Sequence, residues 1–267
     1  MEVIKRNTLE ILRDGSLATV RMYPRKSLPF ESAYDVHVEL AEIFQELRTD
    51  DAIRVIVLTG SGEHFLEPRP GYVGPEFKAY RFESHNMWAT FTSIVRLHEA
   101  MALSEKTIVA RVNGNAVGFG SSLVFACDLI VAREDAVIAD NHLQKAAGEE
   151  TGPGLVPGDG GISLIPLYLS PALAKEYLML GRRWTAADLM RLGVLNYAVP
   201  AAKLDQTVAE IVAELLLRPA AALAWTKRLT NRFVVEQLAR TLDAAVAYEI
   251  VNLYQWKHDQ WHQSKSF

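Results

Sequence analysis

The chain has 267 residues, of which 49% are hydrophobic and 22% are charged, and its formal net charge is −4. This length fits one large domain, or a core with a small appendage, because single hydrophobic cores stop growing at about 250–300 residues. Lysines and arginines are scattered along the chain, which argues against nucleic acid or an anionic membrane as a partner.

Short runs rich in β-branched residues predict the strands. They are 16–23 (SLATVRMY), 52–60 (AIRVIVLTG), 107–114 (TIVARVNG), 128–132 (DLIVA) and 136–140 (AVIAD). The second and third are nearly continuous apolar runs, as expected of strands buried on both faces. Helical patterns such as 33–50 (AYDVHVELAEIFQELRTD) lie between the strands. This alternation predicts an α/β fold with a mainly parallel sheet.

Beyond Leu164 the pattern is typical of helices. Ser170 and Thr185 are helix start signals, and residues 204–218 and 220–261 continue the helical pattern to the end of the chain. The sequence therefore predicts that the chain beyond Leu164 is helical.

These patterns suggest a core domain at 1–200 and a helical oligomerisation region at 201–267. Aromatic residues at the helical end, Tyr254, Trp256 and Trp261, suit a subunit interface, so we do not expect a monomer.

Localisation is predicted from what the sequence lacks. Cys127 is the single cysteine, so it cannot form a disulfide within the chain. No apolar stretch approaches the roughly 20 residues that span a bilayer, and the amino terminus has no apolar signal region. We expect a cytoplasmic protein with no membrane partner.

Residues 113–126, NGNAVGFGSSLVFA, connect a predicted strand to an apolar helix through glycines. Glycine costs about 0.5–1 kcal/mol inside regular structure, so this turn has a use for bare backbone. A strand, a glycine-rich turn and a helix place N–H groups beside an open space, where an oxyanion or a phosphate can bind. The turn is neither a dinucleotide-binding fingerprint nor a P-loop, because it lacks G-x-G-x-x-G and Gly-Lys-Ser/Thr.

A set of motifs follows in a fixed order: LTGSGEHF, VNGNAVGFG, ACDLIVA, GLVPGDGG, LMLGRRWTAADLMRLGVLNYAVP and RPAAALAWTKRLT. Their order and spacing over residues 4–227 resemble the crotonase superfamily, which includes the enoyl-CoA hydratases and isomerases. The resemblance implies a spiral of ββα units with a C-terminal helical trimerisation region, assembled as a homotrimer or a dimer of trimers. It also implies a small-molecule substrate, no metal, and coenzyme A only as part of that substrate.

The resemblance further implies an oxyanion hole. The family holds the oxygen of a thioester carbonyl with two backbone N–H groups while the substrate becomes an enolate. The matching positions are Glu67 and Phe119, and backbone donors do not depend on the side chain. Gly118 would then let the substrate oxygen approach the N–H of Phe119.

The acid and base positions of the hydratase branch match only in part. The first position is Ser122 in place of a glutamate, and the second is Glu150. Hydration by paired carboxylates is therefore not expected, although a branch that hydrates and cleaves hydroxycinnamoyl thioesters resembles this chain at both positions.

Asp159, in GLVPGDGG, resembles an aspartate of the superfamily's β-diketone hydrolases, which cleave a carbon–carbon bond with the help of histidines. The simpler alternative is that Asp159 caps a helix. One hydrolase histidine is absent, because Phe119 stands in its place. The other would be replaced by Glu150 or, given an apparent insertion at NHLQKAAGE, by His142.

Residues that recognise coenzyme A are also matched in part. The segment EPRPGYV departs from the A-G-x-D-L of acyl-CoA-binding relatives. Within it, Arg69 is a candidate for binding an anionic group, or a solvated surface arginine. Lys227 matches a lysine that contacts the nucleotide part of the thioester in relatives, or is simply solvated.

The leading interpretation is an enzyme that stabilises an enolate at Glu67 and Phe119, with Glu150 as acid or base and Asp159 as a second carboxylate. It would act on an acyl-CoA thioester as a hydratase, isomerase or lyase. One alternative is a β-diketone carbon–carbon hydrolase that does not use coenzyme A. A second is a non-catalytic binding subunit with the same fold.

Overall fold

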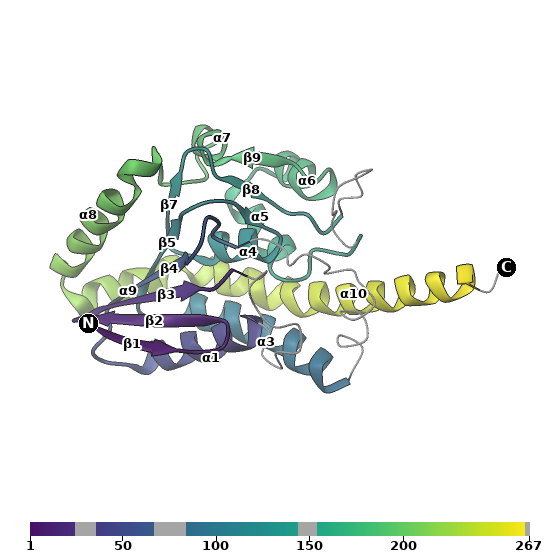
Figure 1. Cartoon of the computed structure of the whole chain (residues 1–267), viewed down its shortest axis with the longest axis horizontal. Helices are drawn as coiled ribbons and strands as arrows, with labels where there is room; N and C mark the ends of the chain where they lie inside the picture. Colours follow the sequence, from purple (N-terminus) through teal and green to yellow (C-terminus); the bar gives the residue numbers. More distant parts are fainter. Residues whose placement is uncertain (25–35, 67–83, 144–153, 265–267) are drawn as a thin grey trace.

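The computed structural model describes residues 1–24, 36–66, 84–143 and 154–264 (Figure 1). Three predicted site residues, Glu67, Arg69 and Glu150, lie outside the described residues.

A seven-stranded sheet forms the centre, in the order β1-β2-β3-β4-β5-β7-β10. β1 (Glu2–Lys5), β2 (Leu9–Asp14) and β3 (Leu17–Met22) pair antiparallel, and β4 (Val55–Gly60), β5 (Thr107–Val112), β7 (Leu129–Arg133) and β10 (Tyr197–Val199) continue from β3 in parallel. A smaller sheet joins β6 (Ala116–Val117), β8 (Val137–Ala139) and β9 (Arg183–Thr185). The mainly parallel sheet is confirmed, whereas the strands before β3 were not predicted.

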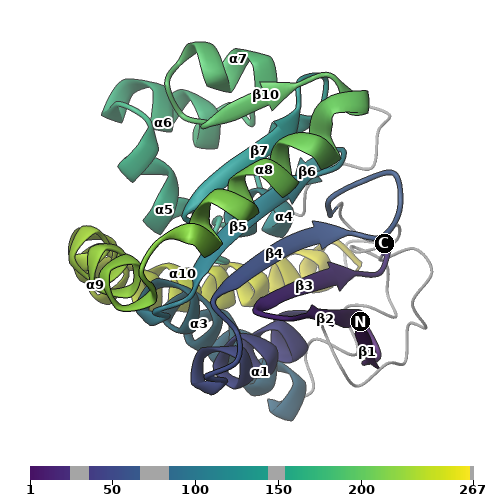
Figure 2. The same cartoon turned by 90° about the vertical axis from the view of Figure 1, so that its left-hand side faces the viewer.

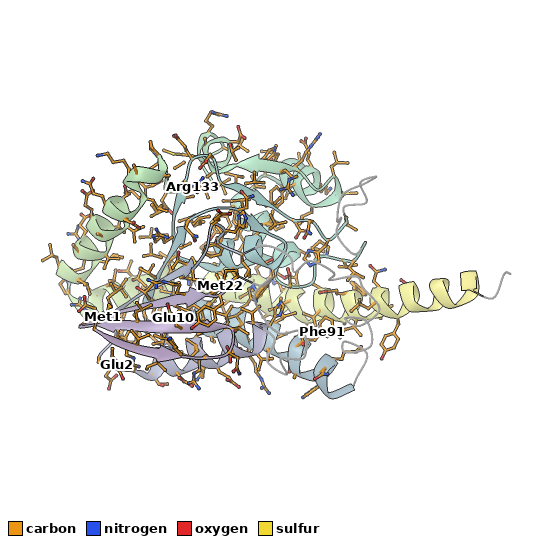
Figure 3. All side chains as sticks on the ribbon, viewed as in Figure 1. Met1, Glu2, Glu10, Met22, Phe91 and Arg133 are labelled. Atoms are coloured by element: carbon orange, nitrogen blue, oxygen red, sulfur yellow. The ribbon has the colours of Figure 1, made fainter. Side chains whose placement is uncertain are left out.

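Both faces of the main sheet are covered, which explains why every residue of β4 is buried. α1 (Val36–Thr49) and α3 (Ser84–Leu103) pack in the core that contains Ile56 and Leu58. α8 (Leu204–Leu217) packs on Val55 and Val57, which point to the opposite face, and Figure 2 shows it lying over β5 and β7. Side chains fill the interior between the sheet and the helices, with Phe91 on α3 among them (Figure 3).

The C-terminal part is less uniformly helical than the sequence suggests. Its helices are α5 (Gly161–Tyr168), α6 (Pro171–Met179), α7 (Ala186–Arg191), the 3-10 turn η2 (Ala201–Lys203), α8, α9 (Ala220–Thr230) and α10 (Arg232–Ser264). The predicted starts are confirmed, because the side chains of Ser170 and Thr185 accept the N–H groups of Leu173 and Asp188. The expectation that the chain beyond Leu164 is helical throughout is wrong, since β9 pairs with β8 and β10 pairs with β7.

The predicted helix 220–261 is also divided, because Asn231 ends α9. α10 then packs along α5 and α3, and its last turns extend past the rest of the chain (Figure 1). In the described part of the chain, no helix combines the length and the apolar character needed to cross a membrane. The boundary between a core and an oligomerisation region stays a prediction.

Candidate functional site

The glycine-rich turn leads directly into α4 (Phe119–Ala126). Gly118 has φ 62°, its N–H donates to the carbonyl of Ala139 (2.9 Å), and a Cβ there would lie 2.6 Å from Asn141 Oδ1. Gly120 is equally crowded, since a Cβ would lie 2.5 Å from the carbonyl oxygen of Leu66. The two glycines therefore permit a left-handed backbone and close contact between segments.

Phe119 is the first residue of α4, at the end of the helix where the macrodipole is positive. The oxyanion role of Phe119, with Glu67 as its partner, stays a prediction. What the structure adds is that the helix carries Ser122 one turn further on, and Ser122 is buried against a charged group.

That charged group is Asp159, which lies in the turn before α5. The Ser122 hydroxyl donates to Asp159 Oδ1 (2.8 Å), and Asp159 Oδ2 lies 3.2 Å from Nε2 of His142. The other ring nitrogen of His142, Nδ1, lies 3.0 Å from Oδ1 of Asp140. These contacts join four side chains into one connected array, and all four are buried: Asp140, His142, Asp159 and Ser122.

Main-chain pairing positions this array beside α4. β6 pairs with β8, so residues 140–142, which follow β8, run next to the turn at Gly118. The N–H of Leu155 donates to the carbonyl of His142 (2.8 Å), which draws the chain leading to Asp159 back to the histidine. Asp159 is not a helix cap, because Gly160 occupies the N-cap of α5 without any side-chain cap. The capping interpretation of Asp159 is therefore wrong.

Charge governs the protonation of the array. Burial lowers the pKa of His142, but Asp159 and Asp140 attract the imidazolium and accept its hydrogen bonds, so its pKa lies well above the ordinary value. Burial raises the pKa of Asp159, but the charge of His142 and the bonds from His142 and Ser122 outweigh it and hold the pKa below the usual range. The two carboxylates on either side of His142 therefore favour its imidazolium form.

This connectivity bears on two other interpretations, a serine nucleophile and a metal site. Ser122 donates to Asp159 and not to the imidazole, so the array is not a Ser-His-Asp nucleophile. Atoms of Asp140, His142 and Asp159 lie within 4.8 Å of one another, the proximity expected of metal ligands. However, each ring nitrogen is directed at a carboxylate, so binding an ion through the histidine would require one of these bonds to break.

A second buried histidine, His98, lies behind the turn. Its Nδ1 is 2.9 Å from the carbonyl of Ile94, which fixes Nδ1 as the protonated nitrogen, and its Nε2 faces Gly160. Burial lowers the pKa of His98 and outweighs the bond to Ile94 and the charge of Asp159, which raise it, so the neutral ring is favoured. The sequence analysis missed His98 and Asp140, although Asp140 stands two residues before the histidine in IADNH.

Lys227 lies in a different part of the molecule. Its Nζ is 2.8 Å from Asp128 Oδ2 and donates to the carbonyls of Lys106 (2.7 Å) and Met101 (3.2 Å). The residue is only 6% exposed, so the expectation of a solvated lysine is wrong. These contacts describe a structural ion pair and give no support to the substrate-binding role predicted for Lys227.

Comparisons with known proteins agree with this architecture. The family description "Enoyl-CoA hydratase/isomerase" matches residues 32–264. A carnitinyl-CoA dehydratase of Escherichia coli is 31% identical over 246 residues, which cover 90% of this chain and 87% of the relative. The crystal structure of an enoyl-CoA hydratase/isomerase from Mycobacterium paratuberculosis superposes with a TM-score of 0.79 at 30% identity, covering 93% of this chain and 94% of the other.

A β-diketone hydrolase from the cyanobacterium Anabaena has the same fold. Its TM-score is also 0.79, at 22% identity, covering 94% of this chain and 96% of the hydrolase. The predicted crotonase architecture is thus confirmed, and the chain belongs to the enoyl-CoA hydratase/isomerase family of the crotonase superfamily.

Proposed function

We propose that the protein catalyses the reversible loss and addition of water on an acyl-CoA thioester, with His142 transferring a proton. The observation that carries this proposal is the buried imidazole between Asp140 and Asp159, next to the turn that begins α4. Similarity to a carnitinyl-CoA dehydratase supports the choice of reaction. Perturbed titratable groups of this kind cluster at functional sites.

The array suits the acid half of a dehydration. A 3-hydroxyacyl thioester loses a proton from Cα, and its Cβ hydroxyl leaves as water after accepting a proton. The imidazolium of His142 is the proposed donor of that proton, and Glu150, outside the described residues, is the predicted base at Cα. Negative charge on the thioester oxygen would be stabilised by the backbone N–H groups of Phe119 and Glu67.

The test is an assay of the purified protein on a panel of 3-hydroxyacyl-CoA and enoyl-CoA thioesters. His142→Gln should lower turnover by about 10²–10⁴-fold, the usual contribution of a general acid or base. Glu176→Gln, which changes an exposed carboxylate paired with Arg182, is the matched control and should keep turnover unchanged. Unchanged turnover in His142→Gln would remove His142 from the mechanism.

A second candidate is hydrolysis of a β-diketone, in which water adds to one carbonyl, a carbon–carbon bond breaks, and the enolate that leaves is protonated at carbon. The contact of 3.2 Å between Asp159 and His142 favours it, because this chemistry needs a carboxylate that orients a histidine. Cleavage of cyclic β-diketones that Asp159→Asn abolishes, with no thioester turned over, would replace the first proposal. Thermal stabilisation by a thioester without turnover of any compound would instead indicate a binding subunit.

A further inference from the structure

We propose that Asp140 is a positioning residue that holds His142 through Nδ1–H, so that Nε2 is the ring atom that exchanges a proton with the substrate. This inference deepens the proposed function and rests on it for the substrate. The orientation and charge of the ring can be measured without any substrate.

The contacts of Asp140 explain how it fixes the ring. One carboxylate oxygen, Oδ1, accepts both the backbone N–H of His142 and its Nδ1–H, each at 3.0 Å. Two donors from the same residue therefore converge on one atom, which restricts both the backbone and the ring of His142. Asp140 has no exposed surface, so water does not compete for these bonds.

The other oxygen of Asp140 shows that the charge itself matters. Oδ2 is buried, has no hydrogen-bond partner among the described residues, and faces Gly161, where a Cβ would lie 2.8 Å away. Burying a carboxylate with one oxygen unsatisfied is costly unless a positive charge is nearby. An asparagine would accept the same two N–H groups without a charge. The carboxylate gains most over an asparagine when the ring beside it is an imidazolium.

The two sides of the imidazole are not equivalent. The Nδ1 side has the shorter bond and is reinforced by the backbone N–H, whereas the Nε2 side has a longer contact of 3.2 Å to Asp159. Asp159 also accepts the Ser122 hydroxyl through its other oxygen, so its charge is shared between two donors. Transfer to the substrate requires the Nε2–H to leave its contact with Asp159. When Nε2 then releases its proton, a neutral imidazole remains with Nδ1–H on Asp140, and the reverse step restores the imidazolium.

Asp140 and Asp159 are the charged groups that raise the pKa of the His142 ring. They are the carboxylates that act on His142 within the described residues. His98 is kept neutral by burial, and His37 acts on Asp159. Glu249, on α10, lies against Gly158 in the same turn.

The test is an NMR titration of the His142 ring nitrogens in the full-length protein, with the signal assigned from its loss in His142→Gln. Asp140→Asn should lower the titration midpoint by roughly one to three pH units, the effect of one neighbouring opposite charge. Asp205→Asn, which removes an exposed carboxylate on α8 outside the array, is the matched control and should leave the midpoint unchanged. An unchanged midpoint in Asp140→Asn, or a neutral ring in the parent protein at neutral pH, would overturn the inference.

The parent protein also supplies a test that does not depend on a variant's folding. As the pH rises, Nε2 should lose its proton while Nδ1 keeps its own, and the opposite tautomer would overturn the inference. Once a substrate is identified, kcat can be measured as a function of pH. In Asp140→Asn the fall of kcat at alkaline pH should begin at a lower pH, and kcat should be reduced by a larger factor than KM is raised. If no substrate is found but the titration shifts as expected, the proposed function fails and the role of Asp140 stands.

Discussion

Replacing Lys227 by methionine should destabilise the fold and leave recognition of the substrate unchanged. The ammonium is 2.8 Å from Asp128 and is also bound by two carbonyls, in a site where the lysine is almost fully buried. Removing one member of a buried ion pair typically costs about 3–5 kcal/mol, because the remaining charge stays buried without a partner.

The hydrogen bonds that Asp128 keeps in Lys227→Met decide where in this range the loss of stability falls. Asp128 still accepts the N–H of Ile108 at 2.7 Å and has the amide of Asn231 at 3.5 Å, so it is not stripped of donors. Burial raises the pKa of Asp128 and Lys227 opposes that rise, so without the lysine the carboxylate takes up a proton more easily and part of the cost is relieved. We therefore expect a loss of about 3 kcal/mol, at the lower end.

The assay is urea denaturation at one fixed protein concentration, followed by measurement of KM for an acyl-CoA thioester. The double variant Lys227→Met with Asp128→Asn should recover part of the loss, since neither charge is then left alone. A change in unfolding free energy below about 1 kcal/mol, together with a tenfold rise in KM, would refute this reasoning. That result would restore Lys227 as a substrate contact.

Three further predictions follow from the site and the surface. Gly118→Ala should lower turnover by about 10²–10³-fold, the loss expected for one oxyanion donor, while Gly15→Ala, which also has positive φ (56°) but no atom near the added Cβ, should not. Because the folded pKa of His142 is raised, its contribution to stability is present below the unfolded value of about 6.5 and is lost as the pH rises through the folded pKa, so His142→Gln should flatten the alkaline side of a stability–pH profile. We also expect a trimer or a dimer of trimers, since the large apolar side chains Trp225, Phe233 and Tyr248 are all more than half exposed; a single-chain mass in light scattering would contradict this.

The central sheet was predictable because its signals are local. Runs of β-branched residues identify β3, β4, β5, β7 and β8, and glycines or polar turns end them. β9 and β10 are short and depend on pairing with strands distant in sequence, so their own residues give little signal. β1 is short and mostly exposed, so it lacks the apolar run that identifies the central strands. The helix starts at Ser170 and Thr185 were also predictable from local signals, because each cap is a hydrogen bond between residues three apart in the sequence.

The residues of the site also divide into those that a local motif predicts and those that long-range pairing brings together. Phe119 and Ser122 were found because they belong to one motif, and Asp159 because its turn resembles a known one. The choice between Glu150 and His142 could not be made from the sequence, since an apparent insertion separates this part of the chain from Asp159. It is the pairing of β6 with β8 that brings His142 to the turn, and the described structure joins it to Asp159 at 3.2 Å.

The buried charges of this chain differ in what neutralises them, and the difference separates structural from functional groups. Glu39 is held by backbone N–H groups of residues 7 and 8 and by the Thr8 hydroxyl, and Asp128 is held chiefly by a lysine. Neither kind of partner changes its charge between pH 5 and 8, so both arrangements are suited to permanent structure. The carboxylates beside His142 instead depend on the one side chain whose ordinary pKa lies in that range. Such a partner stabilises the fold only at the lower end of that range, whereas an enzyme that must release and recover a proton requires a group of this kind.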